Sequence, residues 1–541
     1  MTPPPKRSGG QLVVGALQAQ GIRRISCVPG ESFLPILDAL IDSEIALDVA
    51  RHEAGAGNMA VANARLSGHA GVVMVSRGPG AMHAAIAVHT AEQDAIPLVV
   101  LIGQVALRDR GRGGFQEMNY AQVFGSVAKW VASLDIVERI PETIARAIRV
   151  AESGRPGPVV IEMPEDVLDA AASAPDVTRR IPMRAAPAAE DIDAFHEILA
   201  TAEQPVLILG RGIWSQATAD AAAQFAQKNQ IPVVAGFRCQ DFIDNDSPFY
   251  VGHVGLSTDI RLIGRLEEAD VVVSVGGHFG DAETKGYEIL RPRGDRTVVH
   301  VSVEELDVDR YLPANLVIQA TPLEFFQIMN AGDSTAPERH SWVELLRNEE
   351  LERSSAPADT DRLTQIMTWL RDSISPDTII ANGAGNYAIW VHQYLRYRRF
   401  GTQLAPASGA MGFGLPAGIA AGLERPEQPV IAFAGDGCLT MSLSELATLA
   451  ETRVNVTVVV INNGIYGTIH MHQRARFPGR AIGTSIEGPD FVALANSFGI
   501  HANRVTSLEA FQDAFSAARE MSGPALIEVV TDPTELKPRG K

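Results

Sequence analysis

The 541-residue chain contains little cysteine and no long hydrophobic run. Cys27, Cys239 and Cys438 lie far apart and form no CxxC pair, which argues against a disulfide framework and a cysteine-based zinc site. Apolar stretches such as 98–102 are far shorter than the roughly 18 residues that span a bilayer. The start, 1–10, is proline-rich and basic, and no apolar segment of signal-peptide type follows it. We therefore expect a cytoplasmic protein without a membrane partner.

Positive charge is also scarce, because 46 Lys and Arg face 64 Asp and Glu, a formal net charge of −18. Such a chain is a poor non-specific binder of nucleic acids or anionic membranes. Small anionic ligands are not excluded, since local groups can hold them. The hydrophobic content of 46% excludes a disordered or fibrous class.

Short β-branched segments alternate with helix-like segments along the whole chain. This alternation predicts an α/β fold of doubly wound parallel sheets. It divides into three domains, 1–175, 180–340 and 350–541, with boundaries near 175 and 345. Two stretches without periodicity, Ala170–Glu190 and Ala331–Ser341, are predicted linkers. The predicted strands are 71–76, 97–103, 158–162, 206–210, 231–235, 271–276, 297–303, 378–381, 429–434, 455–461 and 525–530.

The third block carries the strongest chemical signal. The predicted strand 429–434 runs directly into Gly435-Asp436-Gly437, and we expect a helix over 442–451 to follow. The next strand ends in Asn462-Asn463-Gly464. Parallel strands bring their carboxyl ends to one edge of a sheet, where doubly wound folds bind ligands. A carboxylate, an amide oxygen and a backbone carbonyl suit Mg²⁺ that carries a diphosphate.

The segment from Gly435 through Asn463 resembles the thiamine-diphosphate motif of the acetolactate synthase and pyruvate decarboxylase superfamily. The resemblance implies a pyrimidine-binding, a central and a diphosphate-binding domain. It implies that Asp436, Asn463 and the carbonyl of Ile465 hold Mg²⁺, and that the backbone of Gly437 and Cys438 meets the diphosphate. The further cofactor-binding residues that it implies are Pro29, Glu53, Asn386, Tyr387, Gly409, Met411, Gly435, Tyr466 and Gly467.

Arg51-His52-Glu53 in the first block supports the same resemblance. The family's glutamate at this position donates to N1′ of the cofactor's aminopyrimidine, a role that calls for a buried carboxyl with a raised pKa. The run of small residues 54–64 permits close helix packing, and we expect it at a subunit interface. The family builds each active centre from the first block of one subunit and the third block of another. We therefore expect a homodimer or homotetramer with active sites between subunits.

Other segments resemble the acetolactate synthases in particular. The implied catalytic residues are Glu53, Gln116 and Met411, where Met411 would wedge between the cofactor rings. The resemblance implies decarboxylation of a 2-oxo acid, with pyruvate as the leading candidate, followed by carboligation to a second carbonyl. The candidate substrate contacts are Ser32, His83, Phe115, Gln116 and His472.

Several positions depart from typical acetolactate synthases. The arginine-rich segment that touches FAD and the acceptor carboxylate in that family is replaced here by His278–Ala282, which leaves both FAD and the acceptor open. His472 replaces a tryptophan that selects the acceptor, and His83 replaces an asparagine; His470 is a further candidate for a substrate-facing group. A non-ligating decarboxylase of a larger 2-oxo acid, of benzoylformate or indolepyruvate type, is therefore the main alternative. An oxalyl-CoA decarboxylase or 2-hydroxyacyl-CoA lyase, and a non-catalytic protein that keeps the fold, are less favoured.

Overall fold

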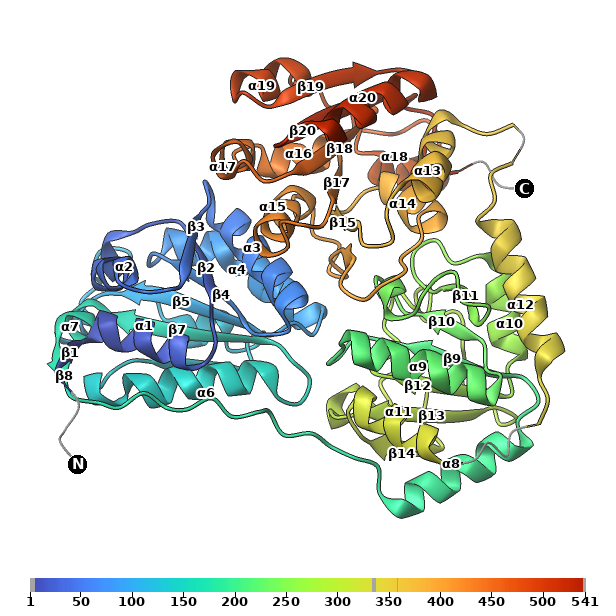
Figure 1. Cartoon of the computed structure of the whole chain (residues 1–541), viewed down its shortest axis with the longest axis horizontal. Helices are drawn as coiled ribbons and strands as arrows, with labels where there is room; N and C mark the ends of the chain where they lie inside the picture. Colours follow the sequence, from blue (N-terminus) through green and yellow to red (C-terminus); the bar gives the residue numbers. More distant parts are fainter. Residues whose placement is uncertain (1–4, 333–336, 358, 539–541) are drawn as a thin grey trace.

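The computed structural model describes residues 5–332, 337–357 and 359–538 and contains three six-stranded sheets, each purely parallel (Figure 1). Helices flank the sheets, which confirms the predicted α/β class of three doubly wound domains. The predicted strands lie in these sheets with end shifts of one or two residues. The predicted linker 331–341 includes residues 333–336, which lie outside the described part. The domain boundaries near 175 and 345 stay predictions; helix α12 (His340–Arg353) crosses the second one.

The first sheet has the strand order β3-β2-β4-β5-β7-β6. Its inner strands β2, β4, β5 and β7 are almost entirely buried, as expected for a sheet covered on both faces, whereas the edge strands β3 and β6 are partly exposed. Helices α1, α2 and α6 pack on one face, and α3 and α4 on the other. Its elements are α1 (Gly9–Ala19), β2 (Arg24–Cys27), α2 (Leu34–Ile41), β3 (Ala46–Val49), α3 (Glu53–Ser67), β4 (Gly71–Val75), α4 (Pro79–Gln93), β5 (Leu98–Gln104), α5 (Tyr120–Phe124), β6 (Trp130–Ser133), α6 (Ile140–Glu152), β7 (Pro158–Pro164) and α7 (Glu165–Asp169).

The third sheet has the order β16-β15-β17-β18-β20-β19, which repeats the strand order of the first sheet. The first and third domains therefore share one topology. Its elements are α13 (Arg362–Ser373), β15 (Ile379–Asn382), α14 (Tyr387–Tyr394), β16 (Gln403–Leu404), α15 (Gly414–Glu424), β17 (Val430–Gly435), α16 (Asp436–Leu439), α17 (Glu445–Thr452), β18 (Val456–Asn462), α18 (Gly467–Arg476), α19 (Phe491–Ser497), β19 (His501–Val505), α20 (Leu508–Glu520) and β20 (Ala525–Val530).

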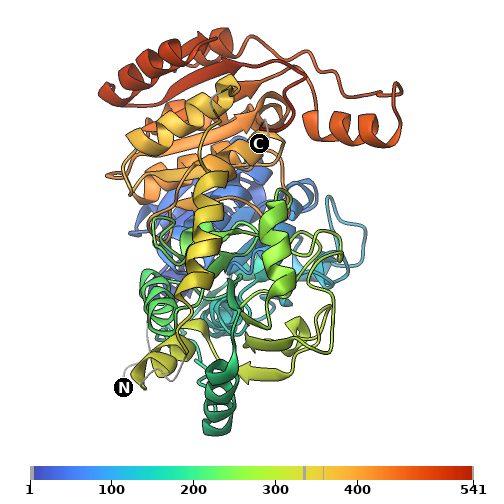
Figure 2. The same ribbon diagram turned by 90° about the vertical axis from the view of Figure 1, so that its right-hand side faces the viewer.

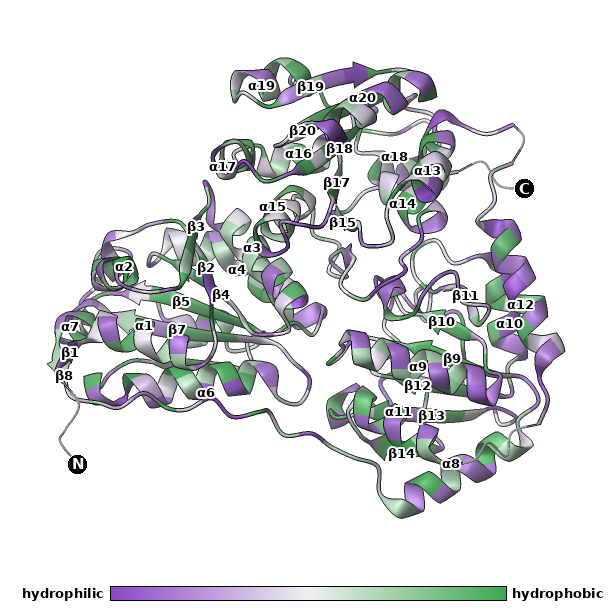
Figure 3. Ribbon diagram, viewed as in Figure 1, coloured by the Kyte–Doolittle hydropathy of each residue, from purple (hydrophilic) through white to green (hydrophobic). Residues whose placement is uncertain are grey.

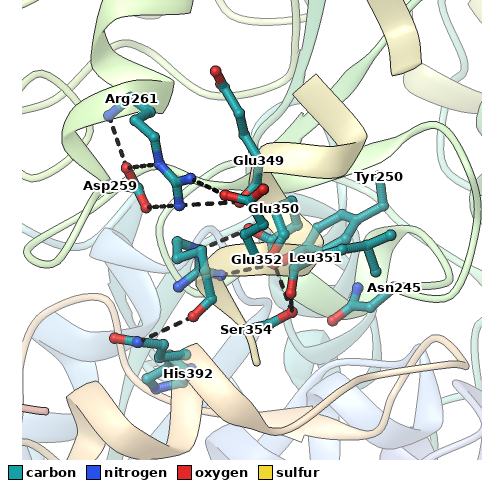
Figure 4. Close-up of polar contacts among 12 residues, drawn as sticks. Asn245, Tyr250, Asp259, Arg261, Glu349, Glu350, Leu351, Glu352, Ser354 and His392 are labelled. Atoms are coloured by element: carbon teal, nitrogen blue, oxygen red, sulfur yellow. Dashed lines mark hydrogen bonds and ion pairs between the residues drawn. The ribbon is translucent and has the colours of Figure 1, made fainter. Parts of the chain in front are cut away.

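The central sheet has a different order, β11-β10-β9-β12-β13-β14. Numbered along the chain, this is the 3-2-1-4-5-6 order of dinucleotide-binding folds. Helix α12 packs on this domain, where Arg261 on α10 bridges Asp259 and Glu352 (Figure 4). Its elements are α8 (Ala189–Thr201), β9 (Pro205–Leu209), α9 (Gln216–Asn229), β10 (Val233–Ala235), β11 (Tyr250–His253), α10 (Ile260–Glu268), β12 (Val271–Val275), β13 (Thr297–Ser302), β14 (Leu316–Gln319) and α11 (Pro322–Ala331).

A small antiparallel pair joins β1 (Arg7–Ser8) to β8 (Ala171–Ala172). Only β8 lies inside the first predicted linker. Hydrophobic residues concentrate in the sheets and in the helices that cover them (Figure 3), and the buried ones form the cores. When the molecule is turned by 90°, the segment that contains α18, coloured orange-red, extends away from the third domain (Figure 2). None of the helices in the described residues is long and apolar enough to cross a membrane.

The small residues of α3 pack inside the chain, against α4 and α15. The ideal Cβ of Gly57 would lie 2.5 Å from Cβ of Ala87, so only glycine allows this approach of α3 to α4. One hydrophobic cluster runs from α3 and α4 into α15 and the third sheet. The expectation that the run 54–64 forms a subunit interface is therefore wrong for its buried face, because close packing between two domains of one chain also favours small residues.

Arg339 ties two helix C-termini together in the central domain, and its removal provides a test of this packing. Its buried guanidinium donates to the carbonyls of Ala202 at 2.9 Å, Asn229 at 2.9 Å and Leu199. A cation suits carbonyls that lack helical partners. We expect Arg339→Met to lower the free energy of unfolding by about 3 kcal/mol, measured by urea denaturation. Arg180→Met, at an exposed position, is the control, and an equal loss in both variants would contradict this account.

Candidate active site

Asp436 lies where two neighbouring parallel strands end. It follows β17 directly, and β17 pairs with β18 so that Gly435 lies opposite Ile461. The carboxylate accepts the N–H of Gly437 at 2.9 Å and the N–H of Gly464 at 2.8 Å. Only 3% of Asp436 is exposed, and burial raises the pKa of its carboxyl despite these N–H donors. The aspartate therefore joins the ends of the two strands.

The helix after this motif begins earlier than the sequence pattern predicts. Helix α16 starts at Asp436 itself, and α17 starts at Glu445, whereas one helix was expected over 442–451. The glycines and Asp436 allow the chain to enter a helical turn directly from β17, with Gly435 as the N-cap. The first N–H groups after the strand thus lie at the sheet edge, beside Asp436.

Asn463 and Ile465 belong to the loop that follows β18. Gly464 has a φ of 68°, a left-handed conformation that glycine adopts without strain. The amide oxygen of Asn463 accepts the N–H of Ile465 at 3.2 Å, and Ile465 forms a β-bridge with Ser485. The structure thus places the carboxylate, the amide and the carbonyl of the predicted Mg²⁺ set around one loop, and all three residues line one cavity.

This cavity has a volume of about 590 Å³, within the range of about 300–1,000 Å³ usual for cofactor sites. Its walls come from the third and central domains. Thirteen of the predicted site residues line it: Asn386, Tyr387, Gly409, Met411, Gly435, Asp436, Gly437, Cys438, Asn463, Ile465, Tyr466, Gly467 and His472. The hard oxygen donors, the backbone at Gly437 and the volume together fit a magnesium-bound diphosphate cofactor.

Met411 lies on a loop of this wall. Gly409 and Gly412 on either side have φ values of 69° and 79°, so the loop turns at both ends. The N–H of Gly412 donates to Sγ of Cys438 at 3.2 Å, and Tyr387 packs beside the same sulfur with its hydroxyl 3.7 Å away. Met411 is half-buried against the core of the third domain. Cys438 and Tyr387 thus hold the loop that presents Met411.

A second group of predicted residues lies at the carboxyl edge of the first sheet, around the turn 76–80. Oε2 of Glu53 lies 2.8 Å from Nδ1 of His83, and the ring of His83 stacks on His52 with centroids 4.6 Å apart. The hydroxyl of Ser32 lies 3.2 Å from that of Ser76, and Ser32 is 1% exposed. This geometry places His83 directly on the carboxylate of Glu53.

Gln116, Phe115 and Pro29 complete this group. Gln116 has a φ of 62°, and its Cβ lies 2.9 Å from the ideal Cβ of Gly78. Phe115 is 77% exposed, and Pro29 is exposed as well. None of the six residues from the first domain lines the 590 Å³ cavity. Within one chain, the predicted site is therefore divided into two groups on different domains.

Glu445, which the sequence reasoning missed, holds the backbone just before Glu53. Its carboxylate is fully buried and accepts the N–H groups of Arg51, at 3.2 and 3.3 Å, and His52, at 3.0 Å. Thr448 donates to it at 2.6 Å. Burial raises the pKa of Glu445. The third domain thus positions the start of α3, and no local sequence signal marks this contact.

The sequence analysis also did not predict the central-domain wall of the cavity. It is formed mainly by Phe237, Arg238, Gln240, His253, Leu256 and Ser257. Arg238 follows the end of β10, and the rule that parallel strands present ligands at their carboxyl ends could have pointed to it. Asp281 and Ala282 also line the cavity, so part of the altered segment 278–282 does reach the site. His470 does not line it; its Nδ1 lies 3.0 Å from the hydroxyl of Thr484.

Comparison with known families agrees with the division of the fold into three domains. Residues 7–123 match the N-terminal TPP binding domain of thiamine pyrophosphate enzymes, residues 192–329 the central domain, and residues 383–529 the C-terminal TPP binding domain. Together the matches cover well over half of the chain. The chain therefore belongs to the thiamine pyrophosphate enzymes, whose cofactor is also called thiamine diphosphate. The predictions of the family, the enzyme class and thiamine diphosphate as the cofactor are confirmed, while Mg²⁺ stays a prediction and FAD stays open.

Within this family the chain resembles the acetolactate synthases over its full length. It is 27% identical to the acetolactate synthase isozyme 2 large subunit of Escherichia coli, with 98% of this chain and 96% of that protein covered. It is 28% identical to a probable acetolactate synthase large subunit of Methanocaldococcus jannaschii, over 98% and 93%. It is 29% identical to the acetolactate synthase of Bacillus subtilis, over 97% and 94%.

Asp436 provides the test of the cofactor cavity. Asp436→Ala removes both the carboxylate and its bond to Gly464, so we expect the Kd for thiamine diphosphate with Mg²⁺ to rise at least about tenfold, or 1.4 kcal/mol. Isothermal titration calorimetry measures this change. Asp513→Ala, on the exposed face of α20, is the matched control. Unchanged affinity in Asp436→Ala would show that the cofactor binds elsewhere.

Proposed function

We propose that this chain is a thiamine-diphosphate- and Mg²⁺-dependent transferase that decarboxylates pyruvate and joins the two-carbon unit to a second carbonyl compound. The observation that carries the proposal is the cavity at the joined ends of β17 and β18, lined by Asp436, Asn463 and Ile465. The full-length relatives named acetolactate synthase support the reaction class. When bound, thiamine diphosphate supplies a thiazolium that accepts the electron pair released when a 2-oxo acid loses CO₂.

The chain's own residues bind and orient the reactants. The carboxylate of Asp436, the amide oxygen of Asn463 and the carbonyl of Ile465 are proposed to hold Mg²⁺, and the backbone at Gly437 and Cys438 would meet the diphosphate. Met411 supports the cofactor from the loop that Cys438 holds. Desolvation in a half-buried cavity strengthens these electrostatic contacts.

Glu53 is proposed to hold the proton that the aminopyrimidine needs at N1′. Its side chain is 16% exposed and contacts Nδ1 of His83, so most of it is buried and a small part stays accessible. Gln116 lies beside the same turn, close to Gly78. We propose that Gln116 and Phe115 face the substrate, because they lie on the same edge as Glu53.

A homo-oligomer with active sites between subunits follows from the division of the site. Glu53 belongs to the first domain, whereas the cavity is lined by the central and third domains of the same chain. Exposed apolar residues lie beside both groups, such as Phe115 at 77%, Ile469 at 53%, Phe477 at 52% and Ile482 at 81% exposure. Exposed apolar patches mark interaction surfaces. We propose that a second subunit covers them and completes each site.

A panel of 2-oxo acids with product analysis tests the reaction. With Mg²⁺ and thiamine diphosphate, we expect CO₂ release from pyruvate and a ligated 2-hydroxy-3-oxo product. Glu53→Gln is expected to lower kcat about 10²–10⁴-fold, because it removes the proton-holding carboxyl. Glu44→Gln, exposed in the same domain, is the control. An aldehyde product without a new C–C bond from a larger 2-oxo acid would instead establish the non-ligating decarboxylase.

Mixing two inactive variants tests the shared site. In a heterodimer of Glu53→Gln and Asp436→Ala, one active site carries both changes and the other carries neither. We therefore expect an equal mixture, exchanged in mild denaturant, to regain about a quarter of the wild-type activity. Each variant mixed with itself serves as the control. If Glu53 and Asp436 of one chain acted together, no activity would return.

A further inference from the structure

The strand order of the central sheet predicts a crevice for a dinucleotide. In a sheet of order 3-2-1-4-5-6, the connections after the first and fourth strands leave in opposite directions, and a diphosphate binds between them. Here these strands are β9 and β12, which pair with Leu209 opposite Val275. FAD is a dinucleotide that the sequence left open. The residues that follow β9 and β12 therefore decide whether it fits.

The backbone closes the crevice between the two strands. The N–H of Gly277, after β12, donates to the carbonyl of Arg211, after β9, at 3.0 Å. Nε2 of His300 on β13 lies 2.8 Å from the carbonyl of Gly277. An ideal Cβ at Gly210 would lie only 2.5 Å from Cα of Gly277. Because the loops after β9 and β12 touch where they would have to diverge, the space between them does not admit a diphosphate.

The turn after β9 is also filled by its own groups. Gly210 and Gly212 match the start of the glycine-rich dinucleotide pattern, but Ser215 stands in the place of its third glycine. Oγ of Ser215 accepts the N–H of Thr218 at 3.2 Å, an N–H in the first turn of α9. Nε1 of Trp214 donates to the carbonyl of Gly210 at 2.9 Å, so the buried indole lies against the turn. The chain itself thus uses groups that a diphosphate would need.

The cation next to this turn is already paired. The side chain of Arg211 is 9% exposed, and its Nη2 lies 3.2 Å from the carboxylate of Glu283. Nη2 also donates to the carbonyl of Phe237 at 3.0 Å. Its Nε lies 3.8 Å from the carboxylate of Asp94, at the C-terminal end of α4 in the first domain. Two acids from different domains therefore compensate the charge of Arg211.

A second arginine forms the same kind of bridge. Arg155, on the loop before β7 in the first domain, lies with Nε 3.2 Å from Asp307, which follows β13. Its Nη1 donates to the carbonyl of Glu92 at 2.7 Å. His278 lies among these charges: burial lowers its pKa, and both arginines and the acids Glu283 and Asp307 act on it. The imidazole is therefore neutral at pH 7 and adds no cation.

We infer that the central domain binds no FAD or other dinucleotide, and that the ion pairs of Arg155 with Asp307 and of Arg211 with Glu283 and Asp94 occupy this edge instead. The three carboxylates would repel a diphosphate, whereas they compensate the two arginines. The pairs bridge the first and central domains, and removing one partner leaves a poorly solvated charge. This inference goes beyond the proposed function, whose decarboxylation and carboligation leave no net oxidation and require no flavin.

A separate cavity of about 290 Å³ beside α9 is the other candidate for a dinucleotide. It is lined by parts of 179–184 and 212–215, and neither Gly210 nor Gly277 belongs to its lining. Its volume lies at the lower end of the range for small-molecule sites. Its arginines are each paired with an acid: Arg65 with Asp241 at 2.8 Å, Arg179 with Glu152 at 2.9 Å and Arg184 with Glu324 at 3.1 Å. Charges compensated in this way do not favour a diphosphate.

Flavin content and thermal stability test the inference. We expect the purified protein to lack the visible absorption of flavin and to release no flavin on denaturation, as measured by chromatography. Adding FAD or NAD⁺ is expected to leave Tm unchanged, because only a ligand of the native state raises it. Thiamine diphosphate with Mg²⁺ is the positive control. A stoichiometric flavin, or a Tm that rises with the concentration of either dinucleotide, would overturn the inference.

Substitution of Arg155 tests the ion-pair bridge. Arg155→Met leaves Asp307 without this partner, so we expect Tm to fall by at least about 4 °C. We expect Asp307→Leu, added to Arg155→Met, to restore part of this loss, because the two effects are coupled. Arg519→Met, exposed on α20, is the control. If Arg155→Met does not fold, as judged by circular dichroism, Arg155→Gln replaces it.

Equal Tm values in the Arg155 and Arg519 variants, or additive losses in the double variant, would show that the bridge does not hold the domains. Neither the flavin content nor these Tm values depend on turnover. A chain that releases no CO₂ from any 2-oxo acid would therefore contradict the proposed function and leave this inference to be decided by its own measurements.

Discussion

The contact between Asp436 and Gly464 is the interaction on which the rest of the site depends. A parallel sheet places the ends of β17 and β18 side by side, and the buried carboxylate joins the two loops that follow them. Because Oδ1 accepts the N–H of Gly437 while Oδ2 accepts that of Gly464, the strand end, the first turn of α16 and the loop with Asn463 form one unit. Hydrogen bonds thus tie the cavity wall together where hard oxygen ligands are needed.

In the first domain, too, candidate residues gather where parallel strands end at one edge of the sheet. This domain repeats the strand order of the third. There the turn 76–80 gathers Glu53, His83 and Gln116 at the sheet edge. The two domains meet through α3 and α15, and the buried Glu445 accepts the N–H groups just before Glu53. The packing that joins the domains thus also fixes where Glu53 begins its helix. It keeps Glu53 away from the cavity of its own chain, which is the physical basis for proposing a second subunit.

Much of the fold could be predicted because buried parallel strands are short, β-branched and bounded by glycine or proline, as in the segments that became β5 and β18. The residues proposed to hold Mg²⁺ could be named from the sequence because they follow two predicted strands directly. The interpretation of the run 54–64 as a subunit interface was wrong for its buried face. Small residues favour any close helix contact, within a chain as well as between chains. The start of α16 was missed because capping by Gly435 depends on the loop geometry at the sheet edge.

The sequence by itself determined three α/β domains, the family, and the residues whose neighbours in the chain carry their meaning, such as Asp436, Asn463 and Glu53. Only the tertiary structure decided which residues from distant segments meet. His52 and Glu445 are separated by 393 positions, and Arg238, His253 and His392 come from three different segments of the chain. Such contacts depend on how domains pack, which local propensity and spacing do not encode.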